Sequence, residues 1–404
     1  MYEKLNETKI VIIRNICNMN TINDVVEKLG VYTKKEIAQQ PQMWIKTFEL
    51  IYSLKFEIER FFKKFSDKET DVILTGAGSS AFIGNAVFGV ILKYQQRPSR
   101  VVPNTELITH PEYFLQKNKT TVLVSFGRSG DSPESLAAVK TVDNYCTKSY
   151  HLIFTCNYKG ELYLQTDNDR SLRILLPPET NDVSLAMTSS FSSMMLAFIL
   201  VSKVNSFEQE EKKIIELSKC GSKLLNKYEN LISNIANLDF KRAVFLGSGP
   251  LVGTAEESHL KMQELTDGRV MSAFNSFLGF RHGPRVIVND ETLLVYLFSD
   301  DQTSRKYEFD LVKQINQTKK GMAQIAVSHK PVSINNVKFD LDVCLGQIND
   351  DKLEIEYLCV LEVMLSQILG YYKSLSLGLN PDQPSVSGTI SRVVEGVKIY
   401  HNML

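Results

Sequence analysis

Short apolar runs alternate with segments of helical spacing from residue 71 onward. Apolar runs of this length, bounded by Gly, Ser or Pro, are typical of buried strands. A strongly apolar segment at 189–204 predicts a buried helix after them. Strands that alternate with helices predict a parallel sheet with helices on both faces. The strands expected in this first half are 72–74, 100–102, 121–124, 151–155 and 172–176.

The same order begins again in the second half. The strand expected at 243–246 leads into Gly247-Ser248-Gly249, as 72–74 leads into Gly76-Ala77-Gly78. Further strands are expected at 292–298 and 323–327, and an apolar helix at 353–373. A strand followed by Gly-x-Gly at matching places indicates an internal duplication. We therefore expect two α/β domains, at 71–205 and 239–404, the second ending in a C-terminal tail.

Two polar stretches that read as helical flank the first domain. Residues 1–70 are expected to form a helical N-terminal segment, in which 47–64 has helical spacing. The stretch 34–41 reads as a helix stopped by Pro41. Residues 206–238, rich in Lys and Glu, are expected to form a helical connection between the domains.

Composition places the chain among ordinary globular proteins. Its 404 residues suffice for two or three domains, and 43% are hydrophobic and 23% charged. Lys plus Arg and Asp plus Glu are both 46, a balance that argues against a nucleic-acid partner. The longest apolar run near the middle, 194–201, is too short to span a membrane, and the first residues lack a signal peptide. We expect a cytoplasmic protein with no membrane partner.

The six cysteines are scattered and contain no CxxC pair. This pattern predicts free thiols in a reducing cytoplasm and no zinc site. We accordingly expect no metal and no cofactor. The cysteines are Cys17, Cys146, Cys156, Cys220, Cys344 and Cys359.

Two turns rich in Ser and Gly follow strands of the first half. Ser79 and Ser80 follow the strand at 72–74, and the loop 127–132 follows the strand at 121–124. Backbone N–H groups, hydroxyls and the positive end of a helix dipole suit a phosphate monoester. Carboxyl ends of parallel strands meet in one crevice, so the two turns are expected to converge. The alternative is that these serines only cap their helices.

Neither turn matches a nucleotide-binding motif. Gly76-x-Gly78-x-x-Ala81 superficially resembles the dinucleotide fingerprint, but the acidic residue expected at the end of the next strand is missing. Neither loop ends in the Gly-Lys-Ser/Thr of a phosphate-binding loop for nucleoside triphosphates. Nicotinamide or flavin binding and triphosphate hydrolysis are therefore disfavoured.

Candidate groups for proton transfer lie in the second half. Glu257, Lys261 and Glu264 fall on one helix face at i, i+4 and i+7. The alternative for this face is a solvated stripe of salt bridges. His282 precedes Gly283-Pro284 on a turn, and its alternative is a turn histidine without a role. A carboxylate and an imidazole beside a phosphate site are the groups that move protons on a sugar.

Four segments together resemble the sugar isomerase (SIS) domain family: 78–80, 127–132, 257–264 and 282–284. The two-domain order is similar to the isomerase half of glucosamine-6-phosphate synthase, over roughly residues 30 to 400 and including the lead-in 35–41. The tail 380–394 is similar to that of the AgaS-type branch. Its members are described as galactosamine-6-phosphate deaminase/isomerases or tagatose-6-phosphate aldose–ketose isomerases. The implied fold is α/β, with two tandem SIS domains after a helical N-terminal segment.

The resemblance implies a role for each matching residue. Glu264 would move the proton between C1 and C2, and His282 would open the ring from the partner subunit's side of a dimer. Lys261, on the face of Glu264, is counted with the substrate-binding residues. The phosphate would be held by Ser80, Ser129, Ser132 and the backbone N–H of Arg128, a sugar hydroxyl by Ser79, and the sugar would be lined by Thr188 and Ser189.

Two positions depart from the synthase. Gly127 replaces the first serine of its phosphate loop. Thr389, which we count with the substrate-binding residues, stands where the synthase has a lysine that forms an imine with a ketose. A mechanism through that lysine is therefore in doubt here. The chain also lacks a glutaminase domain to supply ammonia, so ammonia release or isomerisation without nitrogen is expected.

The expected reaction converts galactosamine 6-phosphate to tagatose 6-phosphate and ammonia by proton transfer between C1 and C2. It needs no metal or redox cofactor, because the aldehyde–imine system stabilises the carbanion. The expected assembly is a homodimer or higher homo-oligomer with shared active sites. Two alternatives stay open: an aldose–ketose isomerase of hexose phosphates without amine release, and a non-catalytic regulator that senses sugar phosphates.

Overall fold

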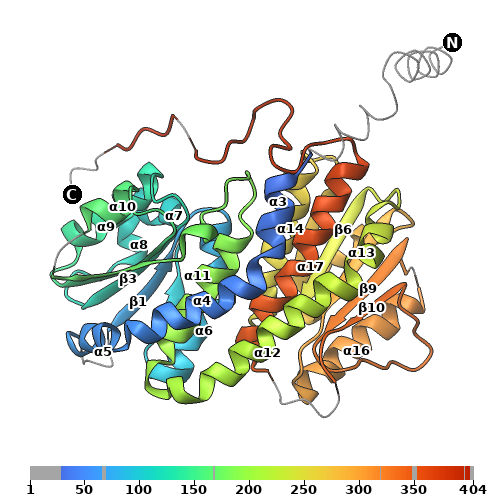
Figure 1. Ribbon diagram of the computed structural model, residues 1–404, viewed down its shortest axis with the longest axis horizontal. Helices are drawn as coiled ribbons and strands as arrows, with labels where there is room; N and C mark the ends of the chain where they lie inside the picture. The colour runs from blue at the N-terminus through green and yellow to red at the C-terminus, as the bar shows by residue number, and fades with distance from the viewer. Residues whose placement is uncertain are drawn as a thin grey trace.

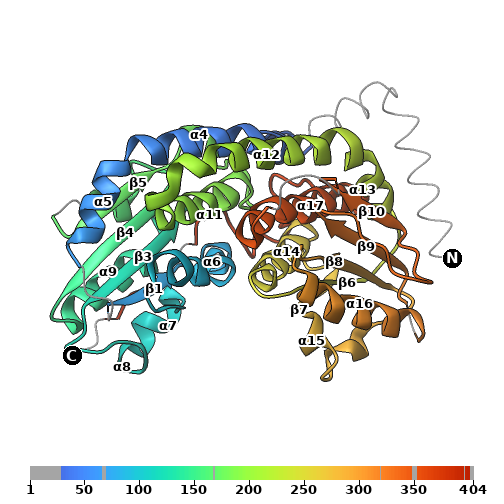
Figure 2. The ribbon, with the colours of Figure 1, turned by 90° about the horizontal axis from the view of Figure 1, so that it is seen from below.

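Two sheets, each made of parallel strands, lie side by side in the computed structural model, and long helices bridge them along one flank (Figure 2). The structure describes residues 29–65, 70–166, 169–318, 320–347, 353–394 and 396–400. Residues 1–28 of the expected helical N-terminal segment, and Cys17 with them, lie outside these ranges. No disulfide joins the described cysteines.

The first sheet has the strand order β2-β1-β3-β4-β5, and each neighbouring pair is parallel. Its central strands β1 and β3 are buried along their whole length, because helices cover both faces. This explains their continuous apolar runs. The strands are β1 Asp71–Thr75, β2 Ser99–Val101, β3 Thr121–Gly127, β4 Ser149–Thr155 and β5 Ser171–Leu175.

The second sheet repeats this order as β7-β6-β8-β9-β10, again with parallel neighbours. The expected duplication and α/β class are confirmed. Edge strands β7 and β10 were not predicted, since β7 is mostly half-exposed and polar and β10 has only four residues. The strands are β6 Arg242–Gly247, β7 Met271–Ser276, β8 Thr292–Leu297, β9 Ala323–Ser328 and β10 Leu341–Cys344.

Helices follow the strands in matching positions of both halves (Figure 1). The first half contains α6 Ser79–Gln95, α7 Asn104–Thr109, α8 Pro111–Phe114, α9 Pro133–Tyr145, α10 Glu161–Gln165 and α11 Ser189–Ser202. The second contains α14 Leu251–Leu265, α15 Phe277–Phe280, α16 Gln302–Asn316 and α17 Ile355–Ser376. Every residue of α11 is buried, which accounts for its apolar character on all sides. No single helix among the described residues is long and apolar enough to cross a membrane, though α11 passes on length and composition when paired with the bent segment after it.

The bridging layer consists of α3 Val31–Ala38, α4 Gln40–Ser53, α5 Lys55–Lys63, α12 Glu210–Lys223 and α13 Glu229–Ala236. Helix α3 does end before Pro41, but Pro41 is the second residue of α4, where its missing N–H is harmless. The single helix expected over 47–64 is broken at Leu54. Trp44 of α4 donates a hydrogen bond to Ser192 Oγ of α11 at 3.0 Å. Gly221 of α12 allows the close packing, because a Cβ there would lie 2.6 Å from the Trp44 ring.

The two halves meet where α6 and α14 cross in opposite directions. A Cβ on Gly253 of α14 would lie 2.3 Å from the backbone nitrogen of Ala86 in α6, so the backbones are almost in contact. Asn85 Nδ2 donates to Glu256 Oε2 at 2.6 Å beside this point. The crossing carries the N-terminus of α6 to the C-terminal half of α14.

We expect Gly253→Ala to lower the free energy of unfolding by about 2 kcal/mol, because the added methyl must push two packed backbones apart. Denaturant unfolding followed by circular dichroism measures this. Gly89→Ala is the matched control, since Gly89 is an exposed glycine of α6 with open space around its Cα. It should stabilise the protein by about 0.5–1 kcal/mol through helix propensity. An unchanged or raised midpoint for Gly253→Ala contradicts the close crossing.

Candidate functional site

The two serine turns lie at the carboxyl ends of neighbouring strands. Thr75, the last residue of β1, pairs with Ser125 of β3, so the loops after both strands start side by side. The strand order reverses between β1 and β3, and crevices at such points bind ligands in open α/β sheets.

The turn after β1 depends on two glycines. A Cβ on Gly76 would lie 2.6 Å from the backbone of Ser80, and Gly78 has a left-handed φ of 55°. Gly78 is the N-cap of α6, so Ser79 and Ser80 are its first two helical residues and not its cap. Both serines are buried; Ser80 Oγ donates to Met187 Sδ at 3.8 Å.

The loop after β3 is held by hydrogen bonds within itself and to Asn157. Ser129 Oγ accepts from the Asp131 N–H at 3.2 Å, and Asn157 Nδ2 donates to the Ser129 carbonyl at 2.9 Å. Ser132 is the N-cap of α9, and its hydroxyl donates to Glu134 Oε2 at 2.5 Å. A Cβ on Gly127 would meet its nearest neighbour at 3.4 Å, so the serine of the synthase is not excluded by lack of room.

The Arg128 side chain hydrogen-bonds to the protein's own backbone and does not contribute to ligand binding. Its guanidinium donates to the carbonyls of Ser184 and Leu185 at 3.1 Å each and to that of Arg392 at 2.7 Å. Burial lowers the pKa of this guanidinium from its ordinary value. The side chain therefore fixes the serine loop to two other segments, and only the backbone N–H stays with the predicted phosphate role.

Thr188 and Ser189 begin α11 and have no exposed surface. The Asp182 carboxylate accepts the N–H groups of Thr188, Ser189 and Ser190 at 2.8, 3.2 and 2.9 Å. Asp182 thus occupies the positive end of this helix. The Ser189 hydroxyl is buried and has no hydrogen-bond partner within the part of the chain that the structure describes.

Lys261 joins the two halves chemically. Its Nζ donates to Ser79 Oγ at 3.0 Å, lies 3.2 Å from Glu257 Oε1, and hydrogen-bonds Glu264 Oε2. Lys261 and Glu257 have no exposed side-chain surface, whereas Glu264 is 21% exposed. The face at i, i+4 and i+7 is therefore a buried ion cluster facing the first crevice, and the alternative of a solvated stripe is wrong.

Burial and charge set the protonation of this cluster. Burial raises the pKa of Glu257 to about 7, against the opposing effect of Lys261. Burial alone would lower the pKa of Lys261, but the two carboxylates outweigh it and the pKa is raised. Lys261 therefore stays charged and holds the Glu264 carboxylate at the mouth of the crevice.

His282 lies apart from this cluster within one chain. It sits on an exposed turn, and its N–H donates to the Gly279 carbonyl at 3.0 Å. Gly283 follows with φ of 120°, which suits glycine. Among the described residues, no hydrogen bond or ion pair joins His282 to Lys261, Glu264 or the serine loops.

The C-terminal tail crosses from the second half to the first (Figure 1). Arg392 donates to the Asp182 carbonyl and to Asn181 Oδ1, both at 2.8 Å, so the tail lies against the loop that leads into α11. Thr389 is exposed, and its hydroxyl lies 2.5 Å from that of Ser387.

Three acidic residues that position these loops were not predicted. Besides Asp182, Glu36 of α3 accepts from the N–H groups of Val183 and Ser184 at 2.5 and 3.2 Å. Asp382 of the tail accepts from the Thr33 N–H and hydroxyl, both at 2.7 Å. The family resemblance of segments 35–41 and 382–384 was the available signal, but the contacts span up to 349 residues of sequence.

The second crevice repeats the backbone of the first with different chemistry. Gly249 has the φ of 55° found at Gly78, but Pro250 and Leu251 follow it in place of the two serines. Asp300 and Asp301 come after β8, where the first half has its serine loop after β3. The second crevice lacks the paired serines after its first strand and has two adjacent carboxylates in place of the second serine loop, so we expect the anion site at the first crevice.

A pocket of about 390 Å³ opens beside the serine loop and not at Lys261. Its lining includes Ser132, Lys140 and Glu161 as well as Ile399 and Tyr400 of the tail. The charged cluster on α14 has the better chemistry for proton transfer, so we place the reacting end of the site there.

Three known proteins to which this chain is similar act on sugar phosphates, according to their names. Residues 64–201 match the SIS domain. D-galactosamine-6-phosphate deaminase AgaS of Escherichia coli is 36% identical over 374 residues, 92% of this chain and 96% of that protein. Tagatose-6-phosphate ketose/aldose isomerase of Escherichia coli is 32% identical with a TM-score of 0.84, covering 93% and 98% of the two chains. A proposed isomerase of the same description from Clostridium novyi NT is 36% identical with a TM-score of 0.90, covering 93% and 96%.

The buried acid Glu308 of the second crevice makes stability depend on pH. Burial raises its pKa from 4.5 to about 7. Between these two pH values, the native state binds more protons than the unfolded state. The contribution of protonated Glu308 to the free energy of unfolding is therefore complete below pH 4.5 and is lost as the pH rises through 7. We expect the stability advantage of Glu308→Gln over the wild type to grow by up to about 3 kcal/mol across that window. Urea unfolding at several pH values measures it, and a difference that does not change with pH contradicts the assignment.

Proposed function

The chain belongs to the SIS domain family, in its AgaS-type branch, and from that membership we propose that it converts galactosamine 6-phosphate and water to tagatose 6-phosphate and ammonia. The observation that carries the proposal is the contact between Lys261 and Ser79. It brings the acid–base helix of one half to the phosphate-binding turns of the other. One crevice thereby offers groups that can bind the phosphate of a sugar phosphate and groups that can move protons at its C1 and C2.

The phosphate is anchored by dipoles. The hydroxyls of Ser80, Ser129 and Ser132 and the N–H of Arg128 surround it, at the N-termini of α6 and α9. Ser79 holds a sugar hydroxyl and thereby connects the substrate to Lys261. Thr188 and Ser189, buried at the start of α11 beside Asp182, are the residues assigned to the wall of the sugar site.

Glu264 carries the proton. Its carboxylate takes the proton from C2 of the open-chain aldehyde while O1 gains a proton, which leaves a 2-amino enol. Glu264 then returns the proton to C1 as the nitrogen loses one. The product is a ketimine at C2. Water adds to that carbon, nitrogen leaves as ammonia, and the oxygen of water becomes the ketose carbonyl. Lys261, charged and hydrogen-bonded to Glu264, holds the carboxylate in position throughout.

At the position where the synthase has its imine-forming lysine, the tail of this chain has a threonine. Thr389 occupies the matching position and bonds only to a neighbouring serine among the described contacts. Hydrolysis of the substrate's own ketimine requires no such lysine. A threonine in place of the lysine therefore fits an enzyme that releases ammonia better than one that captures it.

His282 acts in the site of a neighbouring subunit. Within the described ranges, no hydrogen bond or ion pair joins its exposed turn to Glu264 of the same chain, yet the open form of the sugar requires a proton shuttle between O1 and O5. We propose a homodimer or higher homo-oligomer in which His282 of one subunit opens the ring beside Glu264 of another.

A second candidate is the interconversion of an aldose and a ketose phosphate without amine release. The structural relatives described as tagatose-6-phosphate ketose/aldose isomerases favour it. The same proton transfer by Glu264 serves both reactions. Only the group at C2, amine or hydroxyl, differs between them.

Glu264→Gln is expected to lower kcat for ammonia release from galactosamine 6-phosphate by about 10²- to 10⁴-fold, because the amide cannot accept the C2 proton. Loss of deuterium from C2-labelled substrate, followed by NMR, should fall by the same factor. The corresponding hydroxy sugar phosphate, assayed in parallel, decides between deamination and isomerisation by their kcat/KM ratio.

Glu256→Gln is the matched control, since Glu256 lies on the same helix but hydrogen-bonds to Asn85. The kcat of this variant should stay within about twofold of the wild-type value. Ammonia release by Glu264→Gln above a tenth of the wild-type rate would contradict the assignment of the base.

Ser129→Ala tests the phosphate site. It should raise KM by about 10- to 100-fold and leave kcat unchanged, because the variant loses one hydrogen bond to a charged group.

Mixing two inactive variants tests the shared site. Glu264→Gln and His282→Ala subunits, unfolded together and refolded as mixed dimers, should recover up to about a quarter of wild-type activity, since one site in each mixed dimer has both groups. Each variant alone, treated in the same way, is the control. Activity of the mixture no greater than that of the separate variants contradicts a shared site.

A further inference from the structure

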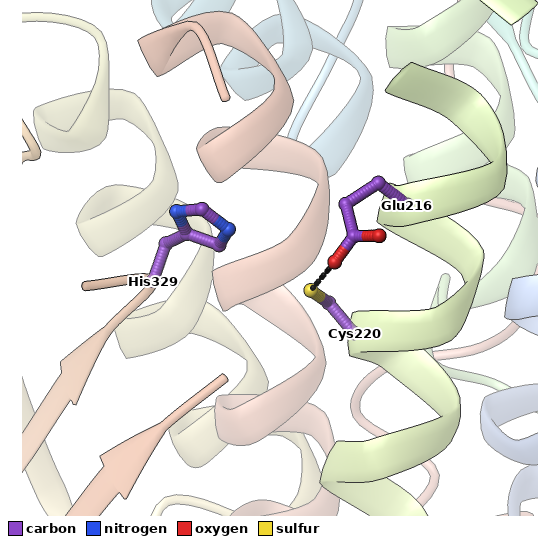
Figure 3. Close-up of side chains that lie close together, drawn as sticks. All are labelled: Glu216, Cys220 and His329. Carbon is purple, nitrogen blue, oxygen red and sulfur yellow. Dashed lines mark hydrogen bonds between the residues drawn. The ribbon is translucent and has the colours of Figure 1, made fainter. Parts of the chain in front are cut away.

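Three side chains with metal-binding atoms meet where α12 passes the end of β9 (Figure 3). Glu216 and Cys220 are one turn apart on α12, and His329 is the first residue after β9. A carboxylate oxygen, the thiol sulfur and an imidazole nitrogen all lie within 4.8 Å of one another. Figure 3 shows the imidazole facing the helix that carries the other two.

The imidazole of His329 is held at only one of its nitrogens. Nδ1 lies 2.8 Å from Asp300 Oδ2, while Nε2 is buried and has no hydrogen-bond partner among the described residues. His329 has no exposed surface. A carboxylate on Nδ1 fixes the tautomer that presents the Nε2 lone pair, which is the arrangement of metal-ligating histidines.

The spacing of the two donor atoms on α12 fits tetrahedral coordination, and the imidazole nitrogen lies within 4.8 Å of both. Cys220 Sγ lies 3.6 Å from Glu216 Oε1. Bonds of about 2.3 Å to sulfur and about 2.1 Å to oxygen at a tetrahedral angle place these atoms about 3.6 Å apart. Gly346 keeps the imidazole accessible, because a Cβ there would lie 2.5 Å from Nε2.

The donor set selects the class of ion. One sulfur, one nitrogen and one oxygen suit a borderline-soft divalent ion such as Zn²⁺ and do not suit Mg²⁺ or Ca²⁺, which prefer oxygen alone. A thiolate and a carboxylate neutralise a charge of two. Glu216 is partly exposed, which gives the ion a route from solvent.

We propose that Glu216, Cys220 and His329 bind one zinc-class divalent ion, with Asp300 orienting the imidazole and water completing the shell. Binding releases the Cys220 proton. The ion would fasten the connection helix α12 to the second sheet, far in sequence from Lys261 and its partners. The site is independent of the proposed reaction. It departs from the expectation of no zinc that the sequence suggested. The sequence did not reveal it, because His329 lies 109 or more residues from the pair of ligands on α12.

Cobalt titration of the chelator-stripped, full-length protein tests the proposal. One equivalent of Co²⁺ should give a thiolate charge-transfer band in the near ultraviolet and the visible bands of a tetrahedral site, and one equivalent of Zn²⁺ should bleach them. Zn²⁺ should also raise the thermal midpoint, since it binds only the native state. Absence of a stoichiometric band overturns the site.

Three ligand-shell variants and one control give the assignment. Cys220→Ser should abolish the charge-transfer band, and His329→Asn, which can still bond Asp300, should weaken Co²⁺ binding at least 100-fold. Asp300→Asn should weaken it about 10- to 100-fold. Cys146→Ser, which removes a buried thiol of the first half, should leave the spectrum and affinity unchanged.

Should Cys220→Ser fail to fold, Glu216→Gln at its partly exposed position gives the same decision. It should keep the thiolate band and weaken binding at least tenfold. A band that persists at full affinity in Glu216→Gln and His329→Asn overturns the proposal, as does a band lost in Cys146→Ser.

Discussion

The buried ammonium of Lys261 is the interaction on which the two halves of this molecule depend. A buried charge is tolerated only when its partners are close and well placed, and Lys261 takes two from its own helix and one, Ser79, from the other half. That bond requires α6 and α14 to cross within backbone contact, which Gly253 permits. Crossing, ion cluster and crevice therefore constrain one another, and no one of them can shift alone.

In the two sites that we propose, one duplicated backbone is adapted to two kinds of ligand. Gly78 and Gly249 share a φ of 55° and shape the same turn, yet serines follow in one half and Pro250 and Leu251 in the other. At the first crevice, serine hydroxyls lie in the turns at the N-termini of α6 and α9. The second crevice gathers carboxylates, and one of them, Asp300, orients an imidazole. On this proposal, the side chains at the strand ends, and not the sheet, decide whether a crevice binds an anion or a cation.

Local patterns in the sequence were sufficient for the fold class, the duplication, the central strands and the serine turns, because each depends on neighbours in sequence. Edge strands β7 and β10 escaped, since exposure and brevity weaken their apolar pattern. Contacts such as Asp382 with Thr33, or His329 beside Cys220, leave no local periodicity. The burial of Glu257 and Lys261 was likewise hidden, because charges at helical spacing look alike on solvated and buried faces.

Arg128 explains why the anion site must rely on dipoles. Its guanidinium is spent on three carbonyls, from the loop before α11 and from the tail, so it does not offer its charge to a phosphate. Hydroxyls and N–H groups at two helix N-termini then have to balance the anion. Gly127 removes one further hydroxyl although its surroundings leave room for a serine. In the proposed site, the backbone N–H groups of the loop would therefore bear more of the anion's charge, and the bonds that fix the loop would matter as much as the groups that touch the ligand.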